Sequence, residues 1–101
     1  MTIYKTARFK VRPEGLAKCQ QAIKEFIAYI KDNEPGTHLY TALHEAEDAA
    51  SFMHYFIFED AAAEEIHHTS AAVKRFTSIL YPETIDGVVF TDYVVVASTG
   101  A

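Results

Sequence analysis

The order of the periodic segments constrains the fold of this chain more than any other feature. Polar and apolar residues alternate along residues 2–11, 37–44 and 51–58, which predicts three half-buried β-strands. Residues 84–97 include the stretch VVFTDYVVVA, nearly unbroken in β-branched and aromatic residues, and predict a fourth, long strand. The acidic stretch 45–48 predicts an exposed turn, so the second and third strands are expected to form an antiparallel hairpin.

A long helix is predicted between the first and second strands. Apolar residues recur there at steps of three and four over about residues 14–31, which gives one apolar stripe. The sequence Glu34-Pro35-Gly36 ends this helix, because proline disfavours helical backbone before it and glycine permits a turn. Cys19 lies on the stripe, so we expect a buried and unreactive thiol.

Two short helices are predicted between the third and fourth strands. Asp60 is the N-cap expected for a helix over residues 61–67. Thr69 or Ser70 caps a second helix, which Pro82 closes.

The chain is therefore predicted to be one domain, residues 1–101, with the order β-α-β-β-α-β. This order is that of the ferredoxin-like split βαβ fold, an α+β class with one antiparallel sheet and helices on one side. The strands at 51–58 and 88–96 carry more apolar residues than one helical layer can cover. Exposed apolar patches of that size are rare in monomers, so we expect a homodimer joined through the helix-free face, with an interface on the order of 2,000 Å² or more.

Composition excludes several classes of partner. The net charge is −5 and no basic cluster occurs, which argues against nucleic acid. No apolar run approaches the ~20 residues that span a bilayer, and the first residues lack the layout of a signal peptide. A single cysteine permits no internal disulfide. We expect a cytoplasmic protein with no membrane partner.

His67 is the leading candidate for a catalytic residue. It lies at the junction of the two short helices, over the sheet, where an imidazole can take a proton from a phenolic or enolic ligand. The structural alternative is an imidazole that hydrogen-bonds the backbone at this junction. The helix dipole favours the cation and burial opposes it, so titration is predicted within the neutral range. His68 lies about 100° further round the helix and is expected to face solvent.

Two further histidines lie on the strands of the predicted hairpin. His44 and His54 share faces with Tyr40 and Phe56, so together they can form the polar end of an aromatic pocket; histidines at a sheet edge or in the core are the alternative. A zinc site from His38, His44 and His54 matches no recognised metal spacing. No glycine-rich phosphate loop supports flavin or nicotinamide binding. Several aromatic residues are expected in the core rather than in a cofactor site: Phe52, Phe56, Phe58, Phe90 and Tyr93.

The element order, the Pro-Gly turn and the segment around His67 together resemble the antibiotic biosynthesis monooxygenase family, a branch of the dimeric α+β barrel proteins. The family typically shows a Pro-Gly turn, an aromatic residue in the second strand, and an Asp-x-x-Ala-x-x-x-His-x-x-Ser segment followed by a phenylalanine. The matching positions are Pro35, Gly36, Tyr40, Asp60, Ala63, His67, Ser70 and Phe76. The resemblance implies that two copies form a dimeric α+β barrel.

The sequence departs from this family at the end of the third strand. Many members carry a glutamate and then a tryptophan or tyrosine there, whereas Phe56 and Phe58 occupy those places here, and Glu59 is not at the matching position. The chain has no tryptophan, which argues against the related haem-degrading branch.

The resemblance implies a small cofactor-independent monooxygenase acting on a quinol- or anthrone-like aromatic substrate with dioxygen. His67 is then the catalytic base, and Tyr40, His44, His54 and Phe56 bind the substrate. No cofactor and no metal are expected. The alternative is a non-oxidative isomerase, or a ligand-binding or protective module, on the same dimeric fold.

Overall fold

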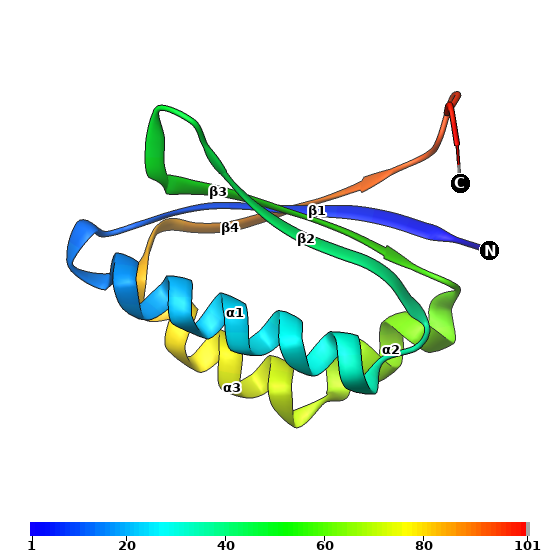
Figure 1. Cartoon of the computed structure of the whole chain (residues 1–101), viewed down its shortest axis with the longest axis horizontal. Coiled ribbons are helices and arrows are strands. Elements are labelled where there is room, and N and C mark those ends of the chain that lie inside the picture. The colour runs from blue at the N-terminus through cyan, green and yellow to red at the C-terminus, as the bar shows by residue number, and fades with distance from the viewer. Residues whose placement is uncertain (101) are drawn as a thin grey trace.

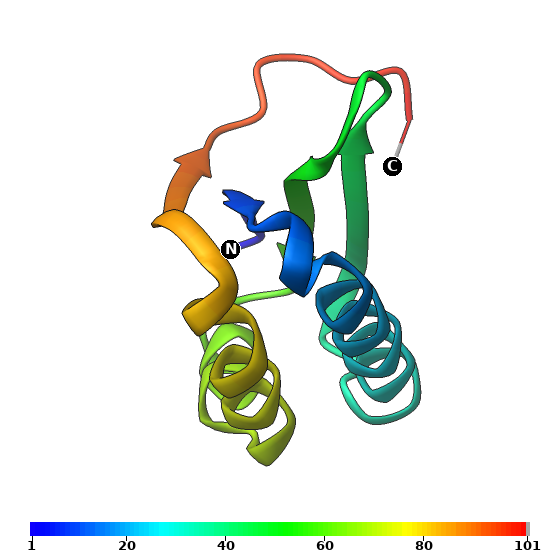
Figure 2. The same ribbon diagram turned by 90° about the vertical axis from the view of Figure 1, so that its left-hand side faces the viewer.

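The computed structural model describes residues 1–100 and shows an antiparallel sheet with all its helices on one face (Figure 1). Figure 2 shows α1 beside the α2–α3 pair beneath the sheet. The predicted ferredoxin-like plan is confirmed, with two short helices in the second helical region. The elements are β1 (Ile3–Val11), the 3-10 turn η1 (Pro13–Gly15), α1 (Leu16–Asn33), β2 (Thr37–Glu45), β3 (Asp48–Phe58), α2 (Ala61–Thr69), α3 (Ala71–Leu80), the 3-10 turn η2 (Tyr81–Glu83) and β4 (Thr84–Tyr93).

The sheet has the strand order β2-β3-β1-β4, and every neighbouring pair is antiparallel. The predicted hairpin of β2 and β3 is present, but its turn is shorter than expected. β3 begins at Asp48, whose carboxylate accepts hydrogen bonds from the Ala50 amide at 3.0 Å and the Ser51 hydroxyl at 2.8 Å. These bonds draw the end of the acidic stretch into the strand.

The core lies between the helices and the sheet. Phe26 of α1 stacks on Phe76 of α3, with ring centroids 4.4 Å apart, which joins the two helices over the sheet. Cys19 is fully buried, so its predicted burial is confirmed, whereas its lack of reactivity stays a prediction. Three of the aromatic residues expected in the core are buried: Phe52, Phe56 and Phe58.

The prediction was wrong for the other two aromatic residues, because Phe90 is 53% exposed and Tyr93 is 44% exposed. Both belong to β4, an edge strand. Tyr93 lies opposite Tyr4 and shares its face, whereas Phe90 lies opposite Ala7, on the face that carries the helices. Alternation along the strand predicts the face of a residue but not whether a helix reaches far enough to cover it.

The fourth strand is also shorter than predicted. Its last pairing is Tyr93 with Tyr4, and residues 94–96 have no neighbouring strand among residues 1–100. Their valine side chains are exposed, and the segment runs away from the sheet (Figure 1). β-Propensity alone therefore does not extend the strand where no partner offers hydrogen bonds.

The helix-free face of the sheet remains open and is rich in apolar side chains. Its exposed members are Leu39, Leu43, Ile85, Val89 and Tyr93. No helix among residues 1–100 is long and apolar enough to cross a membrane.

We predict that this face joins two copies of the chain, because an open apolar sheet face is stabilised by covering it. Light scattering at micromolar concentration should give the mass of a dimer, and Val89→Lys should give a monomer because it buries a charge in the interface. Ile66→Lys is the matched control, since Ile66 is equally exposed on α2. A parent protein that is monomeric, or dissociation caused equally by Ile66→Lys, would contradict this prediction.

Candidate functional site

The most unusual contact in the structure is a buried hydrogen bond between two titratable side chains. His67 of α2 places its Nδ1 atom 2.9 Å from Oε1 of Glu34, the residue that caps the end of α1. Both residues are about 95% buried. A carboxylate only accepts hydrogen bonds, so Nδ1 of His67 donates and carries the proton. The opposite ring nitrogen, Nε2, has no hydrogen-bond partner within residues 1–100 and is left free for a ligand.

The turn after α1 holds the carboxylate in place. The Thr37 hydroxyl donates to Oε1 of Glu34 at 2.9 Å, and the Thr37 amide donates to the Glu34 carbonyl at 3.0 Å. Gly36 lets this turn approach α2, because a Cβ atom at Gly36 would lie only 2.6 Å from the methyl group of Ala63. Ala63 and His67 lie one helical turn apart on the same face, so the close approach brings the turn to the imidazole.

Caps at both ends of α2 position His67 itself. Asp60 accepts a hydrogen bond from the Ala63 amide at 2.9 Å, which confirms the predicted N-cap. At the other end, the Ser70 amide and hydroxyl both donate to the His67 carbonyl, and Ser70 also caps α3. The hydrogen bonds from Ser70 to the His67 carbonyl therefore stabilise the helix junction. The imidazole of His67 contacts Glu34 and not the backbone.

Opposing effects set the charge of His67. Burial lowers its pKa below the ordinary value and is the largest effect, and the hydrogen bond and charge of Glu34 act in the opposite direction. His67 is thus neutral near pH 7, while its cation has a partner ready at 2.9 Å. This combination suits a base that accepts one proton and holds it temporarily. Titration within the neutral range stays a prediction.

A second histidine lies deeper in the core. His54 of β3 is 1% exposed, and its Nδ1 atom lies 2.8 Å from the Tyr40 hydroxyl. Burial lowers the pKa of His54 to about 4, so its ring is neutral at pH 7. Burial also raises the pKa of Tyr40, so the phenol keeps its proton. We assign this proton as the donor to Nδ1, because the opposite direction would leave both the phenol proton and Nε2 of His54 without a partner among residues 1–100. The remaining nitrogen, Nε2 of His54, is buried and has no partner within residues 1–100.

One cavity of about 70 Å³ contacts both histidines. Tyr40 lies between them, with ring centroids 5.4 Å from His54 and 5.9 Å from His67, and it stacks on Phe56 at 4.9 Å. Of the five site residues predicted from the sequence, four line this cavity: Tyr40, His54, Phe56 and His67.

Part of the cavity lining is exposed and forms its mouth. Tyr81 and Phe90 contribute two half-exposed aromatic rings there. Lys5 also lines the cavity, and its ammonium group is held by Glu64 at 2.6 Å and Asp92 at 3.4 Å. His68 also lines the cavity, and its side chain is half exposed, as predicted.

His44 is the predicted site residue that the structure does not bring to the cavity. It lies four residues along β2 from Tyr40, about 13 Å at the rise of a strand. Its Nδ1 atom lies 2.8 Å from the Glu45 carbonyl. Within residues 1–100, no group of three His, Cys, Asp or Glu side chains is placed to hold a metal ion, so His38, His44 and His54 do not converge.

Sequence reasoning missed Glu34, which was interpreted only as part of the signal that ends α1. Thr37, which binds its carboxylate, stands three residues later and is the local signal available in the sequence. The partner of Glu34 lies 33 residues further along the chain, at a distance that no helical or strand period covers.

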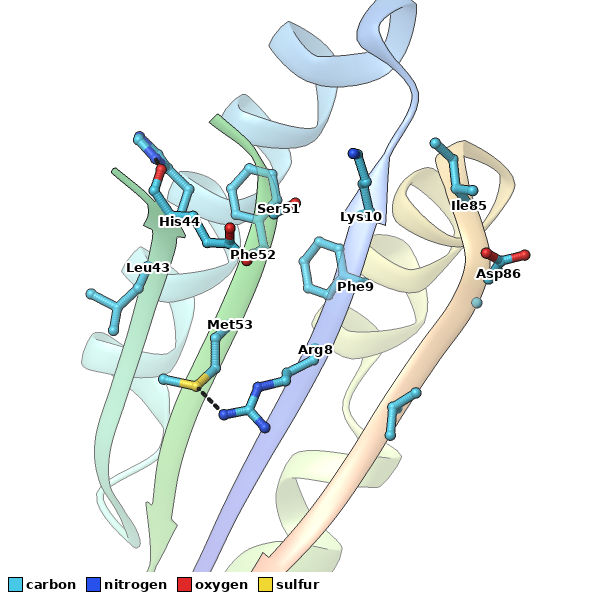
Figure 3. Close-up of a pocket in the computed structure, with 13 residues that line it drawn as sticks. Arg8, Phe9, Lys10, Leu43, His44, Ser51, Phe52, Met53, Ile85 and Asp86 are labelled. Atoms are coloured by element: carbon cyan, nitrogen blue, oxygen red, sulfur yellow. Dashed lines mark hydrogen bonds between the residues drawn. The ribbon is translucent and has the colours of Figure 1, made fainter. Parts of the chain in front are cut away.

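A larger hollow, of about 550 Å³, lies on the helix-free face of the sheet (Figure 3). Arg8 donates to the sulfur of Met53, its neighbour on the adjacent strand, at 3.2 Å, and Leu43, Ile85 and Val89 form apolar parts of the wall. The buried histidines lie on the other side of the sheet. We therefore assign the candidate site to the smaller cavity and relate the hollow to the predicted dimer interface.

Comparison with known proteins identifies relatives of this chain. The sequence profile described as antibiotic biosynthesis monooxygenase matches residues 2–78. No match is found among curated proteins. Among solved structures, a Bacteroides thetaiotaomicron protein provisionally named an antibiotic biosynthesis monooxygenase has a TM-score of 0.91 at 20% identity, covering 99% of this chain and 94% of that one.

Two further solved structures are similar. A Caulobacter crescentus protein with the same provisional name has a TM-score of 0.87 at 20% identity, over 95% of this chain and 91% of that one. Rv0793 from Mycobacterium tuberculosis has a TM-score of 0.88 at 15% identity, over 99% of this chain and 100% of that one. At these identities the likeness establishes the fold alone.

Acid should destabilise the protein through His54. Its pKa is lower in the folded chain, so the unfolded chain binds the extra proton first as pH falls from about 6.5 toward 4, and stability is lost over that window. We expect His54 to remove about 2 kcal/mol from the free energy of unfolding between pH 7 and 5. Urea unfolding at the two pH values measures this.

His54→Gln keeps a hydrogen-bonding side chain but does not titrate in this window, so it should remove that part of the pH dependence. His44→Gln replaces an exposed histidine and should leave the parent profile unchanged. An unchanged profile in His54→Gln would show that His54 is not the group responsible.

Proposed function

The chain belongs to the antibiotic biosynthesis monooxygenase family, and on that premise we propose that it is a cofactor-independent monooxygenase acting on an activated aromatic such as a quinol or an anthrone. The observation that carries this proposal is the buried Glu34–His67 pair beside an aromatic-lined cavity. It supplies a neutral base, a carboxylate that stabilises the protonated base, and surroundings that exclude water.

His67 begins the proposed reaction. Its free Nε2 takes the proton of a phenol, or of the carbon acid of an anthrone, and Glu34 stabilises the imidazolium that forms. Glu34 holds the proton on Nδ1, so the lone pair is on the nitrogen that faces away from the carboxylate. Tyr40 stays protonated and serves to hold the site together through His54, not as a base.

The resulting anion can react with dioxygen without a cofactor. It gives one electron to dioxygen, and the two radicals combine through a new C–O bond to form a peroxide. The same carbon then loses its remaining proton as the O–O bond breaks, which leaves a carbonyl and releases water. One oxygen atom enters the product and the other becomes water, so no external reductant is needed.

We infer from the size of the cavity that the aromatic ring lies at its mouth. About 70 Å³ is less than half of the roughly 150 Å³ that admits benzene. The half-exposed rings of Tyr81 and Phe90 offer stacking surfaces there. In this arrangement the ring lies against them, and only its reacting edge reaches toward His67.

A non-oxidative isomerase is the second candidate, because the same base abstracts the same proton. Phe56 stands where many family members carry a glutamate. Any oxidative step that depends on that glutamate therefore has no counterpart in this chain. The two candidates differ in their need for oxygen. Turnover of an enolisable substrate under anaerobic conditions would favour the isomerase.

His67→Gln tests the proposed base. Glutamine can still donate to Glu34, so the melting temperature should change little, while oxygen uptake with hydroquinones and anthrones should fall roughly 10²-fold or more. The assay uses purified, metal-free protein. His38→Gln is the matched control and should retain parent turnover, because His38 is exposed and does not line the cavity.

Two outcomes would remove the catalytic role of His67. One is a His67→Gln variant that turns over substrate at the parent rate. The other is a variant that unfolds, which would assign the imidazole to stability instead. Oxygen uptake in the parent protein that does not exceed the His67→Gln background would remove the proposed monooxygenase activity itself.

A further inference from the structure

His54, the most buried residue that lines the cavity, carries an unsatisfied hydrogen-bond donor, and we call its side of the cavity the deep end. His54 is 99% buried, and with Nδ1 assigned as the acceptor from Tyr40 the ring proton is on Nε2. Nε2 has no acceptor within residues 1–100. Leaving such a group unpaired costs about 1–3 kcal/mol, so a buried donor that lines a cavity indicates a ligand acceptor there.

The cavity that His54 lines is small and mostly apolar. Ala7, Phe9, Phe76 and Val88 form walls of the same cavity, and the whole volume is about 70 Å³. A six-membered ring needs about twice this volume. A ligand of two or three atoms fits, and apolar walls favour one that carries no charge when it enters.

We infer that the deep end of this cavity is a dioxygen subsite, in which Nε2–H of His54 donates a hydrogen bond to the oxygen molecule as it is reduced. The inference rests on the proposed function. When the substrate anion gives one electron to dioxygen, superoxide forms, and its charge falls on an oxygen atom beside the His54 donor. The hydrogen bond to the anion is stronger than to the neutral molecule, so it favours electron transfer. His54 keeps its proton throughout.

The position of the subsite agrees with the place proposed for the aromatic substrate. His67 and His54 both line the cavity, with Tyr40 between them. The substrate edge at His67 and the oxygen molecule at His54 then share one cavity. The carbon radical and superoxide can combine there before either meets bulk water.

Binding of gas is tested without any turnover. Crystals of the parent protein under xenon pressure should show one xenon atom in the cavity beside His54. In solution, dissolved dioxygen should broaden NMR signals of the residues that line this cavity more than nitrogen does. The inference would be overturned if the cavity held no xenon but an ordered water hydrogen-bonded to Nε2, and if dioxygen had no effect on these NMR signals.

Two alanines give a matched pair of variants. Ala7 on β1 and Ala42 on β2 flank His54 from opposite sides in the sheet, but only Ala7 lines the cavity. Ala7→Val should therefore abolish xenon binding, whereas Ala42→Val should retain it. Equal effects of the two substitutions would contradict a specific subsite at the cavity.

Kinetics then tests the hydrogen bond. His54→Phe should raise the KM for dioxygen, or lower kcat/KM for dioxygen, about tenfold, the effect of one lost hydrogen bond to a charged acceptor. The KM for the aromatic substrate should stay the same. An unchanged dependence on dioxygen would contradict the role of His54. If the parent protein consumes no dioxygen with any substrate, the proposed function fails, and the xenon and NMR results alone decide whether the subsite exists.

Discussion

A single buried hydrogen bond, from Nδ1 of His67 to Glu34, gives this site its chemical character. Placing a carboxylate and an imidazole in the core is costly unless each has a partner, and here each is the main partner of the other. The bond also fixes the tautomer, because the proton on Nδ1 leaves the lone pair on Nε2. The close approach of Gly36 to Ala63 is what brings the two elements near enough for this contact.

The fold was predictable from the sequence because its signals are local. Alternation located three strands, a run of β-branched and aromatic residues located the fourth, and helical periodicity located the helices. The caps at Asp60 and Ser70 marked where the two short helices begin. The long-range contacts had no such signal. Glu34 precedes Pro-Gly, so the end of the helix was a sufficient explanation for its position. No neighbouring residue indicated that its carboxylate contacts α2.

Alternation also limited what could be said about the site. It placed His44 and Tyr40 on the same face of β2, which is correct, but it gave no measure of how far along the strand the cavity extends. His44 therefore entered the predicted site although it lies beyond the cavity. The same limit applies to Phe90. Alternation predicted which face of the sheet it lies on, but not that the helices leave its side chain exposed. Its exposure is part of what makes a mouth for the cavity.

Every proposed step depends on a free Nε2 of His67, so the tautomer of this ring is the decisive property to measure. Ring ¹⁵N chemical shifts of His67 at neutral pH report which nitrogen carries the proton. The account predicts a neutral ring, protonated at Nδ1 and bare at Nε2. A ring protonated at Nε2 with Nδ1 bare, or one already doubly protonated at neutral pH, would contradict it.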